Sequence, residues 1–157
     1  MKKEEKTNVC RVLDQHKVEY EVIHYDPEET NGQHIAELLG ENPEHVFKTL
    51  VTTGKTGAHY VFVIPVCAEL DLKKAASAVG EKNIEMLPQK ELLPLTGYIH
   101  GGCSPIGMKK FFRTTIHETA SELEKFYVSA GKVGCQVHFS PKDLAKVIKI
   151  DYANLIV

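Results

Sequence analysis

The stretch VFKTLVT at residues 46–52, followed after a glycine-containing turn by HYVFVIPV at residues 59–66, decides the fold. Both runs are rich in β-branched and aromatic residues, and the glycines between them mark a tight connection. They predict two neighbouring strands joined by a short loop. Because side chains alternate between the faces of a strand, Lys48 shares its face with Val46 and Leu50.

The apolar flanks of Lys48 leave two interpretations open. A lysine on an edge strand can reach water and discourage aggregation. A partly desolvated ammonium can instead stabilise negative charge on a reacting oxygen.

Further elements are predicted on either side of this pair of strands. Helices are expected over residues 5–16, 30–40 and 72–79, the second with a capping pair of Thr30 and Gln33 and the third between Asp71 and Gly80. Strands are expected over residues 19–25, 84–87, 113–116, 126–129 and 135–139, a turn over 88–93, and helices capped by Thr119 and Ser140. Hairpins and strand-helix-strand crossovers together predict one α/β domain over residues 1–157, with a mixed, curved sheet and flanking helices.

A second informative stretch is TGYIHGGCSPIGMK at residues 96–109, which holds four glycines and one proline. Gly101 and Gly102 permit close approach to the backbone, and Pro105 fixes one backbone angle. The stretch is typical either of a tight connection between strands or of a loop that holds backbone amides against a ligand.

The four cysteines are scattered and form no Cys-x-x-Cys pair, and the sequence has no His-Glu-x-x-His helix. This pattern predicts neither a disulfide framework nor a metal site, and no cofactor is expected. Cys103 differs from the others because it lies in the glycine loop between Gly102 and Ser104. We expect it to be exposed to the ligand of that loop, although no base stands beside it in the sequence.

The composition excludes several classes of protein. The chain has 157 residues, 25% of them charged, and a formal net charge of -2, so it is not a strongly basic nucleic-acid binder and no DNA partner is expected. Contact with RNA would have to come from a local patch such as Lys109, Lys110 and Arg113. No apolar run reaches the roughly 18 residues of a membrane span, and the start lacks the pattern of a signal peptide, so we expect a cytoplasmic protein without membrane contact.

Four segments in order carry a resemblance to a known family. They are FKTLV at 47–51, LDLKK at 70–74, GYIHGGCSPIG at 97–107 and VSAGK at 128–132. Together they resemble the YbaK/EbsC family, bacterial deacylases of Cys-tRNA(Pro) and Cys-tRNA(Cys) that are related to the editing domain of prolyl-tRNA synthetase. The resemblance implies a mixed α/β fold with a barrel-like sheet and a cleft for the aminoacylated 3′ end of tRNA.

The resemblance also implies roles for single residues. Lys48 matches the essential lysine of the family, and Gly101 with Pro105 matches a loop whose backbone holds the aminoacyl group. The remaining residues implied to bind substrate are Tyr25, Gly102, Cys103, Ser104, Ser129 and Gln136.

In the family the substrate's own cysteine thiol attacks the ester, so the enzyme supplies no nucleophile. This agrees with the residues, which show no evident Ser-His-Asp, Cys-His or metal arrangement. If a protein-held water acted instead, its base would be sought among Tyr25, His100 and His138.

Three positions depart from the family pattern. Gln136 stands where many members have an acidic residue, and Val133 and His100 replace frequent arginines. The loss of two cations predicts weaker tRNA binding. Two alternatives stay open: a deacylase for Ala-tRNA(Pro) or another small residue, and a non-catalytic module that binds aminoacyl-tRNA or docks on a synthetase. Prolyl-tRNA synthetase is the expected protein partner.

Overall fold

The computed structural model describes residues 7–25 and 32–157, with side chains from Ile35 onward in the second part. Helices are α1 Asn8–Gln15, α2 Gly32–Leu39, α3 Leu72–Val79, α4 Gln89–Thr96 and α5 Pro141–Val147, with short 3-10 helices η1 Pro43–His45 and η2 Glu118–Glu122. Strands are β1 Glu21–His24, β2 Phe47–Gly54, β3 His59–Pro65, β4 Ile84–Met86, β5 Arg113–His117, β6 Phe126–Ser129, β7 Cys135–Phe139 and β8 Ile150–Ala153. The expected capping pair of Thr30 with Gln33 lies outside the described residues.

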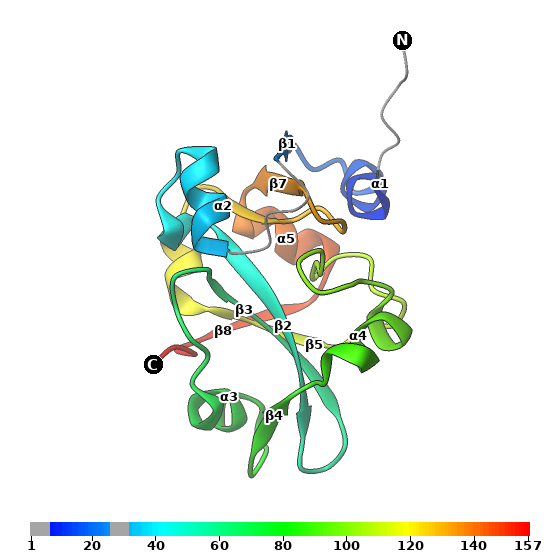
Figure 1. The fold of residues 1–157 in the computed structure, drawn as a ribbon, viewed down its shortest axis with the longest axis vertical. Helices are drawn as coiled ribbons and strands as arrows, with labels where there is room; N and C mark the ends of the chain where they lie inside the picture. The colour runs from blue at the N-terminus through cyan, green and yellow to red at the C-terminus, as the bar shows by residue number, and fades with distance from the viewer. Residues whose placement is uncertain (1–6, 26–31) are drawn as a thin grey trace.

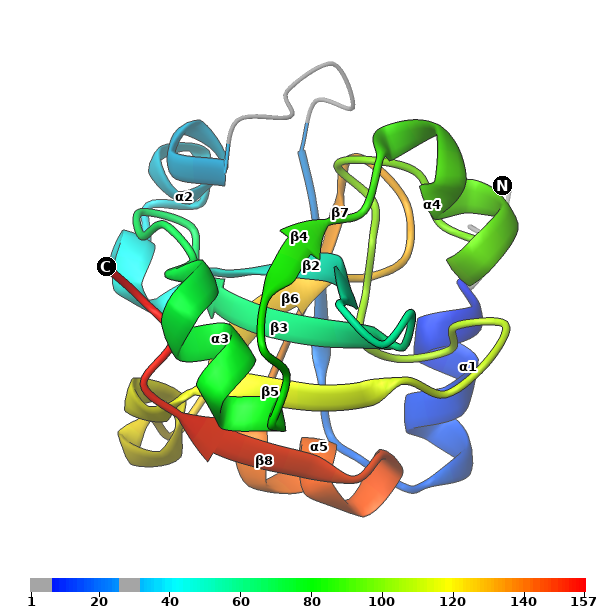
Figure 2. The ribbon, with the colours of Figure 1, turned by 90° about the horizontal axis from the view of Figure 1, so that it is seen from below.

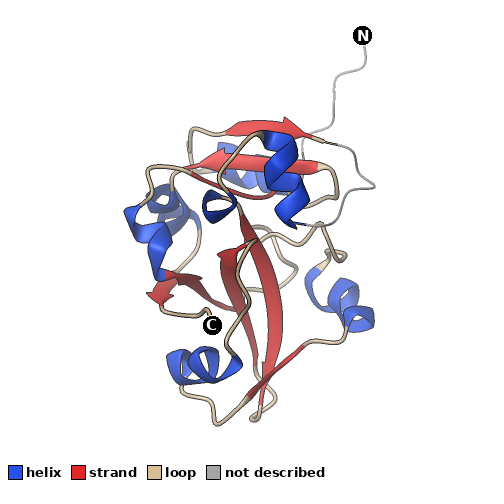
Figure 3. Ribbon diagram, turned by 60° about the vertical axis from the view of Figure 1, so that its left-hand side comes forward, coloured by secondary structure: helices blue, strands red, loops and turns tan. Residues whose placement is uncertain are grey.

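The strands form two sheets that meet along β2. The larger sheet has the order β4-β2-β3-β5-β8, with antiparallel pairing on both edges of β2 and parallel pairing of β3 with β5 and of β5 with β8. The smaller, antiparallel sheet has the order β1-β7-β6 and lies at one end of the long β2–β3 hairpin (Figures 1 and 3). Val46 bridges to Tyr127 of β6, so the two sheets form one curved, barrel-like surface. The predicted mixed α/β fold is confirmed.

The central strand β3 is buried on both of its faces, which explains its continuous apolar sequence. Val61 and Val63 pack into the larger core, where α1 and α5 cover the sheet. Phe62 and Ile64 alternate with them and pack on the other side, against α3. Figure 2 shows β2, β3, β5 and β8 side by side, with α2 and α4 at opposite ends of β2.

Two expectations about secondary structure were wrong, and one strand was missed. Of the expected turn over residues 88–93, residues 89–93 belong to α4. Pro88 precedes the first helical residue, where its missing N–H costs nothing, and Gly97 ends the helix with φ +87°. Thr119 caps no helix; η2 begins directly after His117 and has no side-chain cap. The strand β8 was not predicted, because its four residues IDYA give too short a pattern.

In the described part of the chain, no helix is both long and apolar enough to cross a membrane.

Candidate active site

The candidate site lies where one edge of β2 has no partner strand. Pairing with β4 covers Thr52 to Gly54, and Val46 bridges to β6. Between these two points, residues 47–50 face no other strand on that edge within the described part of the chain. The gap between the two sheets therefore leaves part of β2 open to a ligand.

The direction of the main-chain groups follows from two hydrogen bonds. The carbonyl of Val46 accepts from Val66 N at 2.8 Å on the β3 side, and the carbonyl of Val51 accepts from Leu87 N at 3.0 Å on the opposite side. Because these directions alternate along an antiparallel strand, the backbone N–H and C=O of Thr49 point to the open edge.

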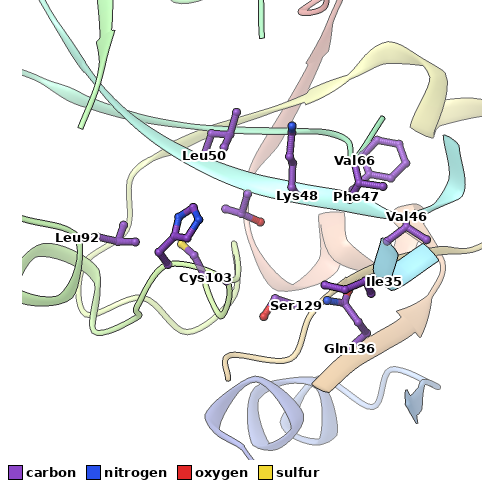
Figure 4. A pocket seen from close by; sticks show the side chains of 13 residues that line it. Ile35, Val46, Phe47, Lys48, Leu50, Val66, Leu92, Cys103, Ser129 and Gln136 are labelled. Atoms are coloured by element: carbon purple, nitrogen blue, oxygen red, sulfur yellow. The ribbon is translucent and has the colours of Figure 1, made fainter. Parts of the chain in front are cut away.

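A cavity of about 140 Å³ lies at this edge (Figure 4). Its walls come from β2, the glycine loop and the β6–β7 region. Two helices add one apolar side chain each, Ile35 from α2 and Leu92 from α4. The lining residues are Ile35, Val46, Phe47, Lys48, Thr49, Leu50, Val66, Leu92, His100, Gly101, Cys103, Ser129 and Gln136. A larger hollow of about 370 Å³ beside η2 contains none of the residues predicted to act on substrate, so size does not identify the site.

The structure brings most of the predicted site residues together. Five of them line the cavity: Lys48, Gly101, Cys103, Ser129 and Gln136. Tyr25 joins through Gln136, whose Nε2 donates to the Tyr25 hydroxyl at 3.3 Å. The other three, Gly102, Ser104 and Pro105, do not line the cavity. They belong to the interior of the glycine loop.

Lys48 is half-buried, and removal of its ammonium from water lowers its pKa below the usual 10.5. Glu69 and Cys67 act in the opposite direction and raise the pKa by a smaller amount. No carboxylate in the described residues lies within ion-pair distance of its Nζ. In the view of Figure 4 the amine ends on the same side of β2 as Leu50, whereas Ser129 and Gln136 lie on the other side.

Two buried polar atoms at the cavity lack a hydrogen-bond partner. They are Oε1 of Gln136 and Oγ1 of Thr49, and the described residues offer no partner to either. Leaving a buried polar atom unpaired costs about 1–3 kcal/mol, so such an atom is a natural contact for a ligand. Sequence reasoning missed Thr49, although it lies inside the segment 47–51 that carries the family resemblance.

The glycine loop packs directly on the turn between β6 and β7. A Cβ atom on Gly102 would come within 2.9 Å of the backbone nitrogen of Val133 and 3.0 Å of the carbonyl carbon of Lys132. Gly101 has φ +86°, a conformation that favours glycine. Val133, which departs from the family pattern, thus contributes its backbone to the support of the loop.

Hydrogen bonds fix the rest of the loop. Tyr98 lies beneath it, and its hydroxyl donates to the carbonyl of Ile106 at 2.5 Å. Ser104 is fully buried, and its Oγ accepts from Ile106 N at 3.3 Å. Pro105 lines a separate small hollow beside Phe111. The loop is therefore held in one shape by its own interior.

Cys103 lines the cavity, yet the residue is only 7% exposed to solvent. Burial raises the pKa of its thiol to about 12. Ser129 is also buried, and its Oγ accepts from Gly131 N at 3.2 Å, which leaves its proton free to be donated. Neither side chain is paired with a base in the described residues.

The three residues considered as bases for a bound water lie at different positions relative to the cavity. His100 is exposed and lines the cavity, and Tyr25 lies behind Gln136. His138 stacks on Tyr127 at 4.0 Å between ring centroids, outside the cavity, and burial lowers its pKa. Within the described residues, no group of three His, Cys, Asp or Glu is arranged to hold a metal ion.

Comparison with known proteins agrees with this architecture. The aminoacyl-tRNA editing domain matches residues 26–147. A protein of Enterococcus faecalis, EbsC, whose assigned name is Cys-tRNA(Pro)/Cys-tRNA(Cys) deacylase, is 43% identical over 156 residues, 98% of this chain and 95% of its own.

Solved structures share the fold at lower identity. A protein described as a trans-editing enzyme for prolyl-tRNA synthetase has a TM-score of 0.82 at 22% identity, over 96% of this chain and 98% of its own. The hypothetical protein APE2540 has a TM-score of 0.86 at 21% identity, over 94% of this chain and 97% of its own. The chain belongs to the aminoacyl-tRNA editing domain family, which confirms the resemblance read from its four segments.

Proposed function

We propose that the protein is a trans-editing deacylase that removes cysteine from Cys-tRNA(Pro) and from Cys-tRNA(Cys), with residues 1–157 as one catalytic domain. Membership of the editing family and the 43% identity to EbsC support this function. The observation that carries the mechanism is the contrast between two groups at the cavity. Lys48 offers a partly desolvated cation, while the thiol of Cys103 is held protonated.

The substrate thiol is the better nucleophile on grounds of ionisation. A cysteine thiol with a pKa of roughly 8.5 is a few per cent thiolate at pH 7. A thiol with a pKa of about 12, as in Cys103, is ionised in roughly one molecule in 10⁵ at that pH. The substrate therefore brings about a thousand times more thiolate than Cys103 provides.

The reaction that follows is balanced without a further reagent. The substrate sulfur forms a bond to its own ester carbonyl carbon, and the bond from that carbon to the ribose oxygen breaks. The thiol proton ends on the ribose oxygen, which releases the tRNA with a free hydroxyl. The other product is a four-membered cyclic thioester, which water opens to free cysteine.

The chain's own residues have positioning and electrostatic roles in this proposal. The flexible stem of Lys48 brings its ammonium over the open edge of β2 to the oxyanion. Oε1 of Gln136 accepts from the substrate's α-amino group, and Thr49 offers its hydroxyl and main-chain groups at the same edge. The backbone near Gly101 bounds the aminoacyl group on the other side.

The need for such a site is physical. Cysteine and proline differ too little in size for one synthetase pocket to separate them well, and a second site that tests for a thiol supplies the missing discrimination. We therefore take prolyl-tRNA synthetase as the partner that supplies the misacylated tRNA.

A deacylation assay with labelled Cys-, Ala- and Pro-tRNA(Pro) and with Cys-tRNA(Cys) tests the function. We expect both cysteine esters to be cleared while Pro-tRNA(Pro) stays intact. Faster cleavage of Ala-tRNA(Pro) would replace the cysteine specificity with the alanine alternative. Tight binding of all four esters without turnover would make the protein a binding module.

A further inference from the structure

The two sides of the cavity differ in charge. Beyond Ile35 and Val46 of the cavity wall, α2 and η1 carry the exposed acidic side chains of Glu37 and Glu44, and Glu44 lines the hollow beside η2. On the opposite side, the segments 92–117 and 125–142 carry six Lys and Arg and no Asp or Glu, although the whole chain has a formal net charge of -2. These two segments meet at the contact of Gly102 with Lys132 and Val133.

Only part of this positive charge is available to a ligand. Arg113, which the sequence placed in an RNA-binding patch, lies 3.6 Å from the Asp151 carboxylate and donates to the carbonyls of Ala78 and Val79. Lys125 pairs with Glu21 at 4.0 Å.

Of the other four, Lys142 lies in α5 beside a separate hollow that Glu122 and Glu124 also line. Lys109, Lys110 and Lys132 remain. All three are exposed, and none has a carboxylate within ion-pair distance in the described residues.

The free lysines flank the loop that forms the cavity wall. The Lys109 side chain packs over Gly97, 3.3 Å from where a Cβ would be, and the backbone of Lys132 contacts Gly102. Gly97 and Gly102 are five residues apart, so their Cα atoms are at most roughly 18 Å apart. A few nucleotides of a single strand span that distance.

An apolar side chain lies between these two positions. Ile99 is 52% exposed in the middle of the segment from Gly97 to Gly102, next to His100 at the cavity. Such a side chain can contact the face of a base or a ribose, while the lysines on either side contact phosphates.

We propose that the single-stranded 3′ end of tRNA enters the cavity across the rim formed by Lys109, Lys110, Ile99 and Lys132, and not from the side of α2 and η1. This rests on the proposed function for the identity of the ester. The positive charge of the lysines and the exposed side chain of Ile99 indicate a single-stranded nucleic acid that ends in a base. The negative charges of Glu37 and Glu44 disfavour approach of the same strand from the side of α2 and η1.

The test uses the full chain with uncharged tRNA(Pro) for binding and Cys-tRNA(Pro) for turnover, each at several salt concentrations. Lys109→Gln/Lys132→Gln should raise the Kd and the KM about tenfold or more. It should also reduce the slope of log K against log salt by about 0.7 for each lysine. Lys73→Gln/Lys82→Gln removes two exposed lysines that do not line the cavity and should leave both quantities unchanged. Glu37→Gln/Glu44→Gln should not weaken binding.

The outcomes separate this surface from the function. Wild-type affinity and slope in Lys109→Gln/Lys132→Gln would overturn the proposed rim, and so would an equal loss in the Lys73→Gln/Lys82→Gln control. Lysine-dependent binding of uncharged tRNA without cleavage of Cys-tRNA(Pro) would leave the rim in place and refute the deacylase. Normal cleavage with an unchanged KM in the rim variant would support the deacylase and refute the rim.

Discussion

The two main walls of the cavity are built in opposite ways. The β2 wall is a regular strand whose free edge exposes main-chain groups and side chains from several consecutive positions, including a half-buried cation. The glycine-loop wall has no regular structure and is held by backbone contact at Gly102 and by the buried Tyr98. The strand wall therefore supplies the polar and charged groups, and the loop wall supplies shape.

This difference predicts that substitutions in the two walls fail in different ways. A change in the strand wall should reduce the rate of the chemical step and leave the fold intact. A change in the loop wall should disturb stability and substrate fit together.

The largest effect is expected for Lys48→Met, which keeps the length and apolar stem of the side chain but removes the charge. We expect kcat to fall about 100-fold or more, since the oxyanion loses its cation. Thermal stability should stay the same or rise slightly, because a partly desolvated charge is removed. Single-turnover kinetics and calorimetry measure the two quantities. Full activity in this variant would refute the role of Lys48.

A smaller but broader effect is expected for Gly102→Ala in the loop wall. The new methyl group meets backbone atoms of Lys132 and Val133, which cannot rotate away, so the fold should lose about 1–3 kcal/mol. The loop should shift, and KM should rise more than kcat falls.

The matched control for this variant is Gly57→Ala in the β2–β3 turn. There the backbone has φ +89° and a Cβ would meet nothing within 4 Å, so strain lowers stability without touching the cavity. If both glycine variants change KM equally, the loop wall has no special part in binding.

A graded effect is expected from pH. Burial lowers the pKa of Lys48, so the ammonium predominates below that lowered value and is lost as pH rises through it. Activity should first rise as the substrate thiol ionises near roughly pH 8.5 and then decline before pH reaches 10.5. Arginine stays charged in this range, so Lys48→Arg should lack the alkaline decline in whatever activity it retains. A decline of the same shape in Lys48→Arg would assign it to another group.

The smallest effect is expected for Cys103→Ala. Its thiol lines the cavity but is protonated at neutral pH, so kcat should change by no more than a few-fold. Cys10→Ala, which removes a buried thiol away from the cavity, is the control for the loss of packing. An inactive Cys103→Ala protein together with an acyl group trapped on Cys103 in the wild type would contradict substrate-assisted attack.

The two walls also differ in how far the sequence predicts them. Alternation in the run 46–52 is enough to place Lys48, Val46 and Leu50 on one face, because a strand repeats every two residues. The unpaired edge that exposes Thr49 depends on where β4 and β6 end along β2, and no local pattern encodes that.

The glycine loop was predictable in its local sequence but not in its contacts. Its glycines were recognisable as special, yet the burial of Cys103 and the contact of Gly102 with the β6–β7 turn are long-range facts. Leu92 was also missed, because two prolines made α4 look like a turn. Periodic segments are thus predictable from sequence, and contacts between distant segments are not.

The central claim is that the substrate's own thiol cleaves its ester, and Ser-tRNA(Pro) tests it most directly. Serine has nearly the shape of cysteine, but its hydroxyl is almost never ionised at neutral pH, whereas a few per cent of the thiol is. In a single-turnover assay at saturating protein, we predict that Ser-tRNA(Pro) binds with a similar Kd and is deacylated at least about 100-fold more slowly than Cys-tRNA(Pro). Equal rates for the two esters would contradict the account and would point to a water activated at the cavity, with His100 as the base that lines it.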